Sequence, residues 1–177
     1  MVKDLRKYTK RNLRTKKVEE FIDSISVTNW IIISNILFFI IATIFLIYDS
    51  STIKYLALQP NYIIEGKYLW TIITSMFMHA NIFHLAINMF VLFSLGNFCE
   101  KIIGRKRFFW FYILSGIFAG ILFVILSGYF GFGIGERIFG SPSIPGVGAS
   151  GAIFAIAGLF VILTPKLRFS IYFFLFS

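Results

Sequence analysis

A serine between glycines, in the sequence Gly148-Ala-Ser150-Gly151, is the residue of this 177-residue chain best suited to nucleophilic chemistry. A glycine-rich stretch precedes Ser150 and an apolar stretch follows it, so we expect a loop to become a helix there. Serine at such a junction commonly caps the helix with its hydroxyl group. It can also attack a carbonyl carbon where backbone N–H groups stabilise the developing negative charge. The local sequence leaves both roles open.

Two upstream residues can contribute to the same chemistry. His84 and Asn88 are four residues apart, so they share one face of a helix, and Asn81 lies one turn earlier. Such side chains inside an apolar helix often do no more than bond to neighbouring helices. Polar groups at membrane depth are nevertheless candidates for function. His84 and Asn88, with the N–H group of Ser150, can form an oxyanion hole for acyl transfer.

The composition of the chain indicates a membrane protein. Hydrophobic residues make up 58% of the sequence and aromatic residues 19%, whereas only 14% are charged. The net charge is +9, and 8 of the 17 basic residues lie between Lys3 and Lys17, directly before the first apolar stretch. A basic tail in that position is typical of contact with anionic membrane lipids. We therefore expect lipids, and not nucleic acid, as its partner.

Four apolar stretches are predicted to cross the bilayer as helices. They cover residues 30–48, 81–98, 108–126 and 150–164, and a fifth begins at Ser170. Gly116 and Gly120, in the third stretch, have the GxxxG spacing that allows close packing. Residues 49–79 mix apolar patches with charges, so we expect a large membrane-embedded loop there. The sequence therefore predicts an all-α membrane protein with four complete transmembrane helices and the start of a fifth.

The distribution of basic residues predicts the orientation in the membrane. Most lysines and arginines lie in the N-terminal tail, in residues 101–107 and at Lys166 and Arg168. Four alternating spans put these three groups on one side, which the positive-inside rule assigns to the cytoplasm. We therefore expect a multi-pass protein with a basic cytoplasmic tail, residues 1–28, and a membrane domain, residues 29–177. The helix of Ser150 then enters the bilayer from the outer face.

Three sets of residues, taken together, resemble the rhomboid family of intramembrane serine proteases. The first two are GxSG around Ser150 and His84-x-x-x-Asn88. The third set follows the second span and comprises Glu100, Gly104, Arg107, Phe108, Tyr112, Gly116 and Gly120. The resemblance covers roughly residues 30–176 and implies a rhomboid-like helical bundle whose large first loop lies in the outer leaflet. It also implies that Ser150 is the nucleophile and that His84 and Asn88 bind the oxyanion.

Two positions depart from the rhomboid pattern in their side chains. The first loop of the family usually carries Trp-Arg, whereas here Trp70 is followed by Thr71. Phe154 stands on the Ser150 helix where a tyrosine is common, which removes a hydroxyl group. Both departures concern the surroundings of the serine and leave the two main motifs intact.

The third departure concerns the general base. Rhomboid proteases use a histidine two spans after the serine, but the only histidines here, His79 and His84, both precede Ser150. A serine hydroxyl is a weak nucleophile without a base. We therefore expect a rhomboid-type domain that is truncated at its C-terminus, with the base in a missing later helix.

The expected function is that of an intramembrane serine endopeptidase that cleaves the transmembrane segments of membrane proteins. No cofactor or metal is expected, because two histidines, one cysteine and no carboxylate within the predicted spans provide no ligand set. The alternative is a non-catalytic rhomboid-like protein that binds transmembrane clients without cleaving them. A transporter or channel is disfavoured, because the predicted spans carry no charged residue.

Overall fold

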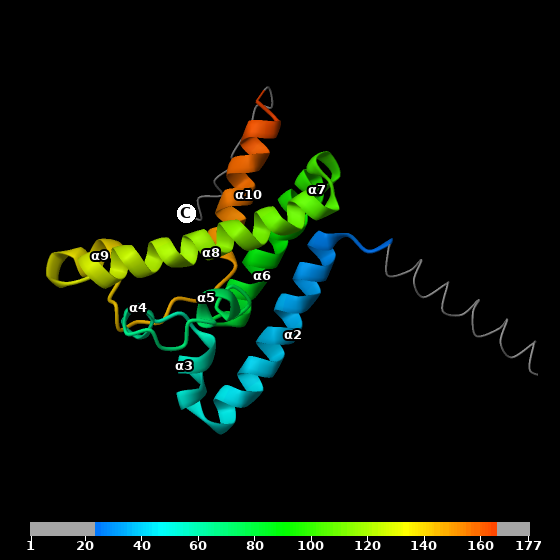
Figure 1. Cartoon of the computed structure of the whole chain (residues 1–177). Helices are drawn as coiled ribbons and strands as arrows, with labels where there is room; N and C mark the ends of the chain where they lie inside the picture. Colours follow the sequence, from blue (N-terminus) through cyan, green and yellow to red (C-terminus); the bar gives the residue numbers. More distant parts are fainter. Residues whose placement is uncertain (1–23, 166–177) are drawn as a thin grey trace, which may run out of the picture.

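The computed structural model describes residues 24–165, which fold into helices joined by short loops (Figure 1). Three helical segments are long and apolar enough to cross a membrane: α2 (Val27–Tyr48), the continuous segment Ile82–Ile103 and α8 (Arg105–Phe130). A shorter apolar helix, α10 (Ser150–Leu163), follows the glycine-rich loop. The chain therefore has the all-helical architecture of a multi-pass membrane protein. Most of the basic tail and the predicted fifth stretch lie outside the described residues.

The fourth predicted span is the shortest of the apolar helices. Helix α10 has 14 residues, which corresponds to about 21 Å at 1.5 Å per residue, less than the ~30 Å hydrocarbon core of a bilayer. The described residues thus contain three helices of spanning length, where the sequence predicted four complete ones. That α10 also crosses the membrane stays a prediction.

The second span is longer than the sequence predicted. It consists of α6 (Ile82–Val91), a π-helical turn η2 (Leu92–Gly96) and α7 (Asn97–Ile103). The segment ends at Gly104, whose φ of 87° is open to glycine and strained for other residues. The prediction had ended this span at residue 98, because charged residues follow. Glu100 therefore lies inside the helix and not in a turn after it.

Glu100 is 5% exposed, and its carboxylate binds the start of α2. It accepts hydrogen bonds from the backbone N–H groups of Val27 and Thr28, both at 2.8 Å, and from the Thr28 hydroxyl at 2.7 Å. An anion at a helix N-terminus is stabilised by the unpaired N–H groups there. The prediction that no carboxylate lies within the spans is therefore wrong at Glu100. The N-terminus of α2 compensates its charge. Helix α2 begins at Val27, three residues before the predicted start of this span at residue 30.

Residues 49–79 form a chain of short elements: η1 (Ser50–Thr52), α3 (Ile53–Leu56), α4 (Pro60–Ile64) and α5 (Thr71–Thr74). Figure 1 shows them gathered between the end of α2 and one side of α8, and both α4 and α5 contact α8. None of these elements is long enough to cross a bilayer. The absence of a spanning helix from residues 49–79 is confirmed.

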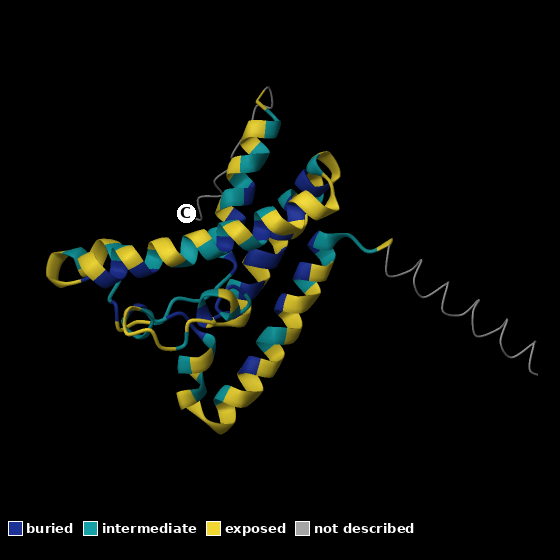
Figure 2. Cartoon of the chain, in the orientation of Figure 1, coloured by how far each residue is buried: buried dark blue, intermediate teal, exposed yellow. Residues whose placement is uncertain are grey.

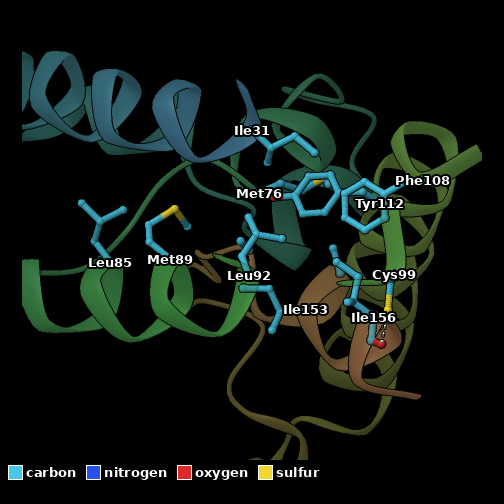
Figure 3. Packing of buried hydrophobic residues seen from close by; sticks show 12 residues of the cluster. Ile31, Met76, Leu85, Met89, Leu92, Cys99, Phe108, Tyr112, Ile153 and Ile156 are labelled. Atoms are coloured by element: carbon cyan, nitrogen blue, oxygen red, sulfur yellow. Dashed lines mark hydrogen bonds between the residues drawn. The ribbon is translucent and has the colours of Figure 1, made fainter. Parts of the chain in front are cut away.

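The core lies where α2, α6, α7, α8 and α10 meet (Figure 3). Its largest fully buried side chains are Leu92, Phe108, Tyr112 and Ile156. Figure 2 shows exposed residues along the outer faces of the long helices, and many of these are large and apolar. This distribution suits helices that face lipid on the outside and pack against one another on the inside.

Both glycines of the GxxxG spacing lie against side chains, and Gly116 also lies against helix α10, where a Cβ atom would be 3.4 Å from Cβ of Ala152. A Cβ atom on Gly116 would collide with the end of the Met76 side chain, and Gly120 faces Leu58. Both partners come from the short-element segment. The tighter glycine contact between α10 and α8 is at Gly151, where a Cβ atom would lie 2.5 Å from Cβ of Ala119.

Candidate active site

Ser150 is the first residue of α10. The residue that precedes the helix is Ala149, and no side chain caps this terminus. The possibility that Ser150 serves as the helix cap is therefore wrong. Among the described residues, no hydrogen bond to its hydroxyl group is formed, so this group is available for other interactions.

A cavity of about 230 Å³ lies beside Ser150. The residues around it come from α8, α10, the glycine-rich loop and the segment before α6. Leu58, Met76 and Phe123 provide apolar walls, while Ser75 and Ser150 are the residues with polar side chains. Glycine and alanine residues of α8 and α10 leave the space open, because they have little or no side chain. The serine thus borders a space that can hold a bound group.

His84 and Asn88 pack against Gly148, in the loop that leads into Ser150. The φ of 117° at Gly148 favours glycine. A Cβ atom there would lie 2.8 Å from Cε1 of His84 and 3.4 Å from Nδ2 of Asn88. Both side chains therefore contact the backbone two residues before Ser150. The structure thus places His84 and Asn88 beside Gly148, two residues before Ser150, while Gly151 provides the close contact with α8. Their role as an oxyanion site stays a prediction.

Helix α6 positions His84 and Asn88 through its first turns. Asn81 caps the helix, and its side-chain oxygen accepts a hydrogen bond of 2.9 Å from the His84 N–H group. Asn88 is buried one turn after His84. The spacing and the cap together direct both side chains to the same loop.

A second histidine, His79, belongs to this cluster, although no spacing in the sequence predicts a role for it there. Its Nε2 atom lies 3.0 Å from Nδ2 of Asn88, and its ring centre lies 5.1 Å from that of His84. His79 lies in the loop before α6, so no helical spacing relates it to Asn88. Burial and the neighbouring His84 lower the pKa of His79 to about 4, so the ring is neutral at pH 7.

The glycine-rich loop is held by the segment of short elements. Leu58 and Gly146 exchange two backbone hydrogen bonds of 3.0 and 2.8 Å, and the Gly148 N–H group donates to the Ser75 carbonyl at 2.9 Å. Asn61 also donates to the Pro142 carbonyl at 3.2 Å. These bonds hold the loop against residues 58–75 and thereby fix the entry of the chain into α10.

The side chains that depart from the rhomboid pattern, at positions 70–71 and 154, lie in different surroundings. Trp70 donates from its ring nitrogen to the Tyr55 carbonyl at 3.0 Å, and Thr71 is buried with its hydroxyl group bonded to the Tyr68 carbonyl at 2.8 Å. Local bonds within the segment therefore hold it at this point. Phe154 is 79% exposed, so it faces away from the packed core.

The chain is similar to known proteins over much of its length. Residues 66–177 match the rhomboid domain. The chain is 30% identical over 123 residues to rhomboid protease GluP of Bacillus subtilis (strain 168), and the matched segment covers 68% of this chain and 21% of that protein. It is 38% identical over 99 residues to rhomboid protease AarA of Providencia stuartii, and this match covers 55% of this chain and 35% of that protein.

The relatives also include a protein named as inactive. The chain is 30% identical over 111 residues to inactive RHOMBOID-like protein 8 of Arabidopsis thaliana, covering 62% of this chain and 28% of that protein. The chain thus spans well under half the length of each of these three relatives. The domain match, in contrast, covers more than half of the chain and includes Ser150, His84 and Asn88. This chain is a member of the rhomboid family.

Proposed function

We propose that this chain carries the nucleophile and the oxyanion site of an intramembrane serine endopeptidase. The observation that supports this best is the cluster at Gly148, where His84 and Asn88 contact the loop that enters Ser150. The Ser150 hydroxyl group, which does not cap α10 and lies beside a cavity, also supports the proposal. Two relatives, GluP and AarA, are named as rhomboid proteases.

The reaction begins when a substrate's transmembrane helix unwinds near its outer end. A helical carbonyl group is hydrogen-bonded within the helix, so unwinding exposes it to attack. Ser150 Oγ bonds to the carbonyl carbon, its proton passes to a base, and the carbonyl oxygen becomes negatively charged. His84, Asn88 and backbone N–H groups stabilise this oxyanion. The amine then leaves with a proton, and water hydrolyses the acyl-enzyme.

The general base is proposed to be a histidine from a helix that follows α10. Within residues 24–165, no hydrogen bond to the Ser150 hydroxyl is formed, and both histidines of the sequence contact other parts of the cluster. An imidazole within reach of Oγ would raise the reactivity of the serine. The chain up to Ser177 is therefore expected to depend on this additional segment.

We further propose how the protein lies in the membrane. Residues 1–28 form a cytoplasmic tail that contacts anionic lipids through its basic side chains. Residues 29–177 belong to the membrane domain, with α10 as the fourth span and the short-element segment in the outer leaflet. Transmembrane segments of other proteins are the expected partners.

The second candidate function is the binding of transmembrane clients without cleavage. One specific observation favours it, namely the relative named as inactive RHOMBOID-like protein 8. The arrangement around Ser150 favours the protease, because a client binder has no need of a nucleophile beside an oxyanion site.

The proposal is tested with the protein encoded by the complete reading frame, including any codons after Ser177. The protein is reconstituted in liposomes with a set of model transmembrane substrates, beside a matched Ser150→Ala variant. We expect cleavage within a transmembrane segment by the wild type and none by the variant. Client capture without cleavage by either protein would favour the binding function and refute the protease.

A further inference from the structure

The ring of His79 links the side chain of Asn88 to the backbone of Phe77 through two hydrogen bonds. It lies between α5 and α6 and is 3% exposed. Its Nε2 atom is 3.0 Å from Asn88 Nδ2, and its Nδ1 atom is 3.3 Å from the Phe77 carbonyl oxygen. Both ring nitrogens therefore have a partner, and the chemistry of these partners restricts where the ring proton lies.

The Phe77 carbonyl oxygen determines the tautomer of His79. A carbonyl oxygen only accepts hydrogen bonds, so Nδ1 must carry the proton. Nε2 of the neutral ring then carries a lone pair and accepts a hydrogen bond. The amide nitrogen of Asn88 is the donor that this lone pair requires.

The opposite orientation of the Asn88 amide conflicts with this network. With Oδ1 facing Nε2, a proton would be needed on Nε2, and the Nδ1 lone pair would then face the Phe77 oxygen. A doubly protonated ring would satisfy both partners, but burial and the neighbouring His84 keep the pKa of His79 at about 4. Only one orientation of the amide satisfies all partners of the neutral ring.

We propose that His79 is a positioning residue that holds the NH₂ group of Asn88 toward the oxyanion site. This inference rests on the proposed protease function. One hydrogen on Nδ2 bonds to His79, and the second is available to another acceptor. Nδ2 lies 3.4 Å from the place that a Cβ atom on Gly148 would occupy, so the donor faces the loop that enters Ser150. Without His79, the amide can rotate and present its oxygen, which repels an oxyanion.

Two substitutions separate positioning from simple packing. His79→Gln keeps both functions of the ring, because its amide nitrogen can donate to Phe77 and its oxygen can accept from Asn88. His79→Phe keeps an aromatic ring but removes the acceptor and the donor. A packing role predicts that the phenylalanine variant is the better substitute, whereas a positioning role predicts the glutamine variant.

The geometry is tested by NMR on the full 177-residue chain in lipid nanodiscs, with histidine and asparagine labelled with nitrogen-15. The sequence contains only two histidines, so the ring signals lost in His79→Gln are those of His79. We expect Nδ1 to be protonated and Nε2 to be unprotonated, with a scalar coupling across the bond from Asn88. A protonated Nε2, or no coupling, would overturn the proposal.

The consequence for the site is tested by the rate at which a fluorophosphonate modifies Ser150 in the complete reading-frame product. We expect His79→Phe to lower this rate about 10- to 100-fold, approaching the effect of losing one oxyanion donor, and His79→Gln to restore most of it. Equal rates for wild type and His79→Phe, or a faster His79→Phe than His79→Gln, would overturn the proposal. A wild type that is never modified would instead refute the proposed serine chemistry, and the NMR spectra then decide the Asn88 orientation alone.

Discussion

The contact between Gly151 and Ala119 determines how closely the helix of Ser150 approaches α8, and its strength can be predicted. An alanine at position 151 would place its Cβ atom 2.5 Å from that of Ala119. Ordinary contacts begin near 3.4 Å, so the helices must separate by about 1 Å. Overpacking of this kind costs about 1–3 kcal/mol, of which the higher helix propensity of alanine offsets up to about 1 kcal/mol. We expect Gly151→Ala to lower the free energy of unfolding by about 1–2 kcal/mol.

The same helix contains a matched control. A Cβ atom on Gly158 meets nothing within 4 Å, so Gly158→Ala is expected to stabilise the protein by up to about 1 kcal/mol. Ala119→Gly removes the opposing methyl group and is expected to suppress the Gly151→Ala defect, with a coupling energy of about 1–3 kcal/mol in the double-mutant cycle. Unfolding by SDS in mixed micelles, followed by tryptophan fluorescence, measures the wild type, the three single variants and the double variant. A stabilising Gly151→Ala, or no coupling with Ala119→Gly, would refute the close contact.

Three further perturbations test other parts of the structure. Glu100→Ala leaves two backbone N–H groups and a hydroxyl group unpaired, so we expect the free energy of unfolding to fall by about 3–5 kcal/mol in the same assay. Glu100→Gln should lower it less. A decrease below about 1 kcal/mol for Glu100→Ala would contradict the capping role. Gly148→Ala should slow fluorophosphonate modification of Ser150, because the new Cβ atom displaces the His84 ring; an unchanged rate contradicts the packing at Gly148. Folding lowers the pKa of His79 from 6.5 to about 4, so the unfolded chain takes up a proton at a higher pH than the folded chain does. The free energy of unfolding therefore falls as the pH drops from about 6.5 to about 4, by at most about 1.4 kcal/mol per pH unit. Above pH 6.5 this contribution is constant, and a His79→Gln variant that keeps the same acid dependence would show that another group causes it.

Hydropathy predicted the helical architecture well because the bilayer imposes a length on its spanning elements. Helix α2 and the other two long helices appear where the apolar stretches lie, within a few residues. The prediction is wrong at Glu100, because a charged residue after an apolar stretch usually indicates a helix end. In the structure this carboxylate bonds to the N-terminus of another helix, a compensation that no local pattern contains.

The sequence predicted part of the candidate site. The spacing of His84 and Asn88 and the glycines around Ser150 gave the residues that meet at Gly148. The role of His79 could not be predicted, because its bond to Asn88 depends on the path of a loop and on the tautomer that Phe77 imposes. The hydrogen bonds between the glycine-rich loop and residues 58 and 75 could not be predicted either, since backbone pairing between irregular segments leaves no periodic signal.

The central claim, that Ser150 is the nucleophile, is tested most directly by locating a covalent adduct. The complete reading-frame product in liposomes is treated with a fluorophosphonate, digested and analysed by peptide mass spectrometry, with Ser150→Ala as the matched control. We expect one phosphonylated residue, Ser150, with modification slowed by His84→Ala and Asn88→Ala. Modification of another serine at the same rate in both proteins, or none at Ser150, would contradict it.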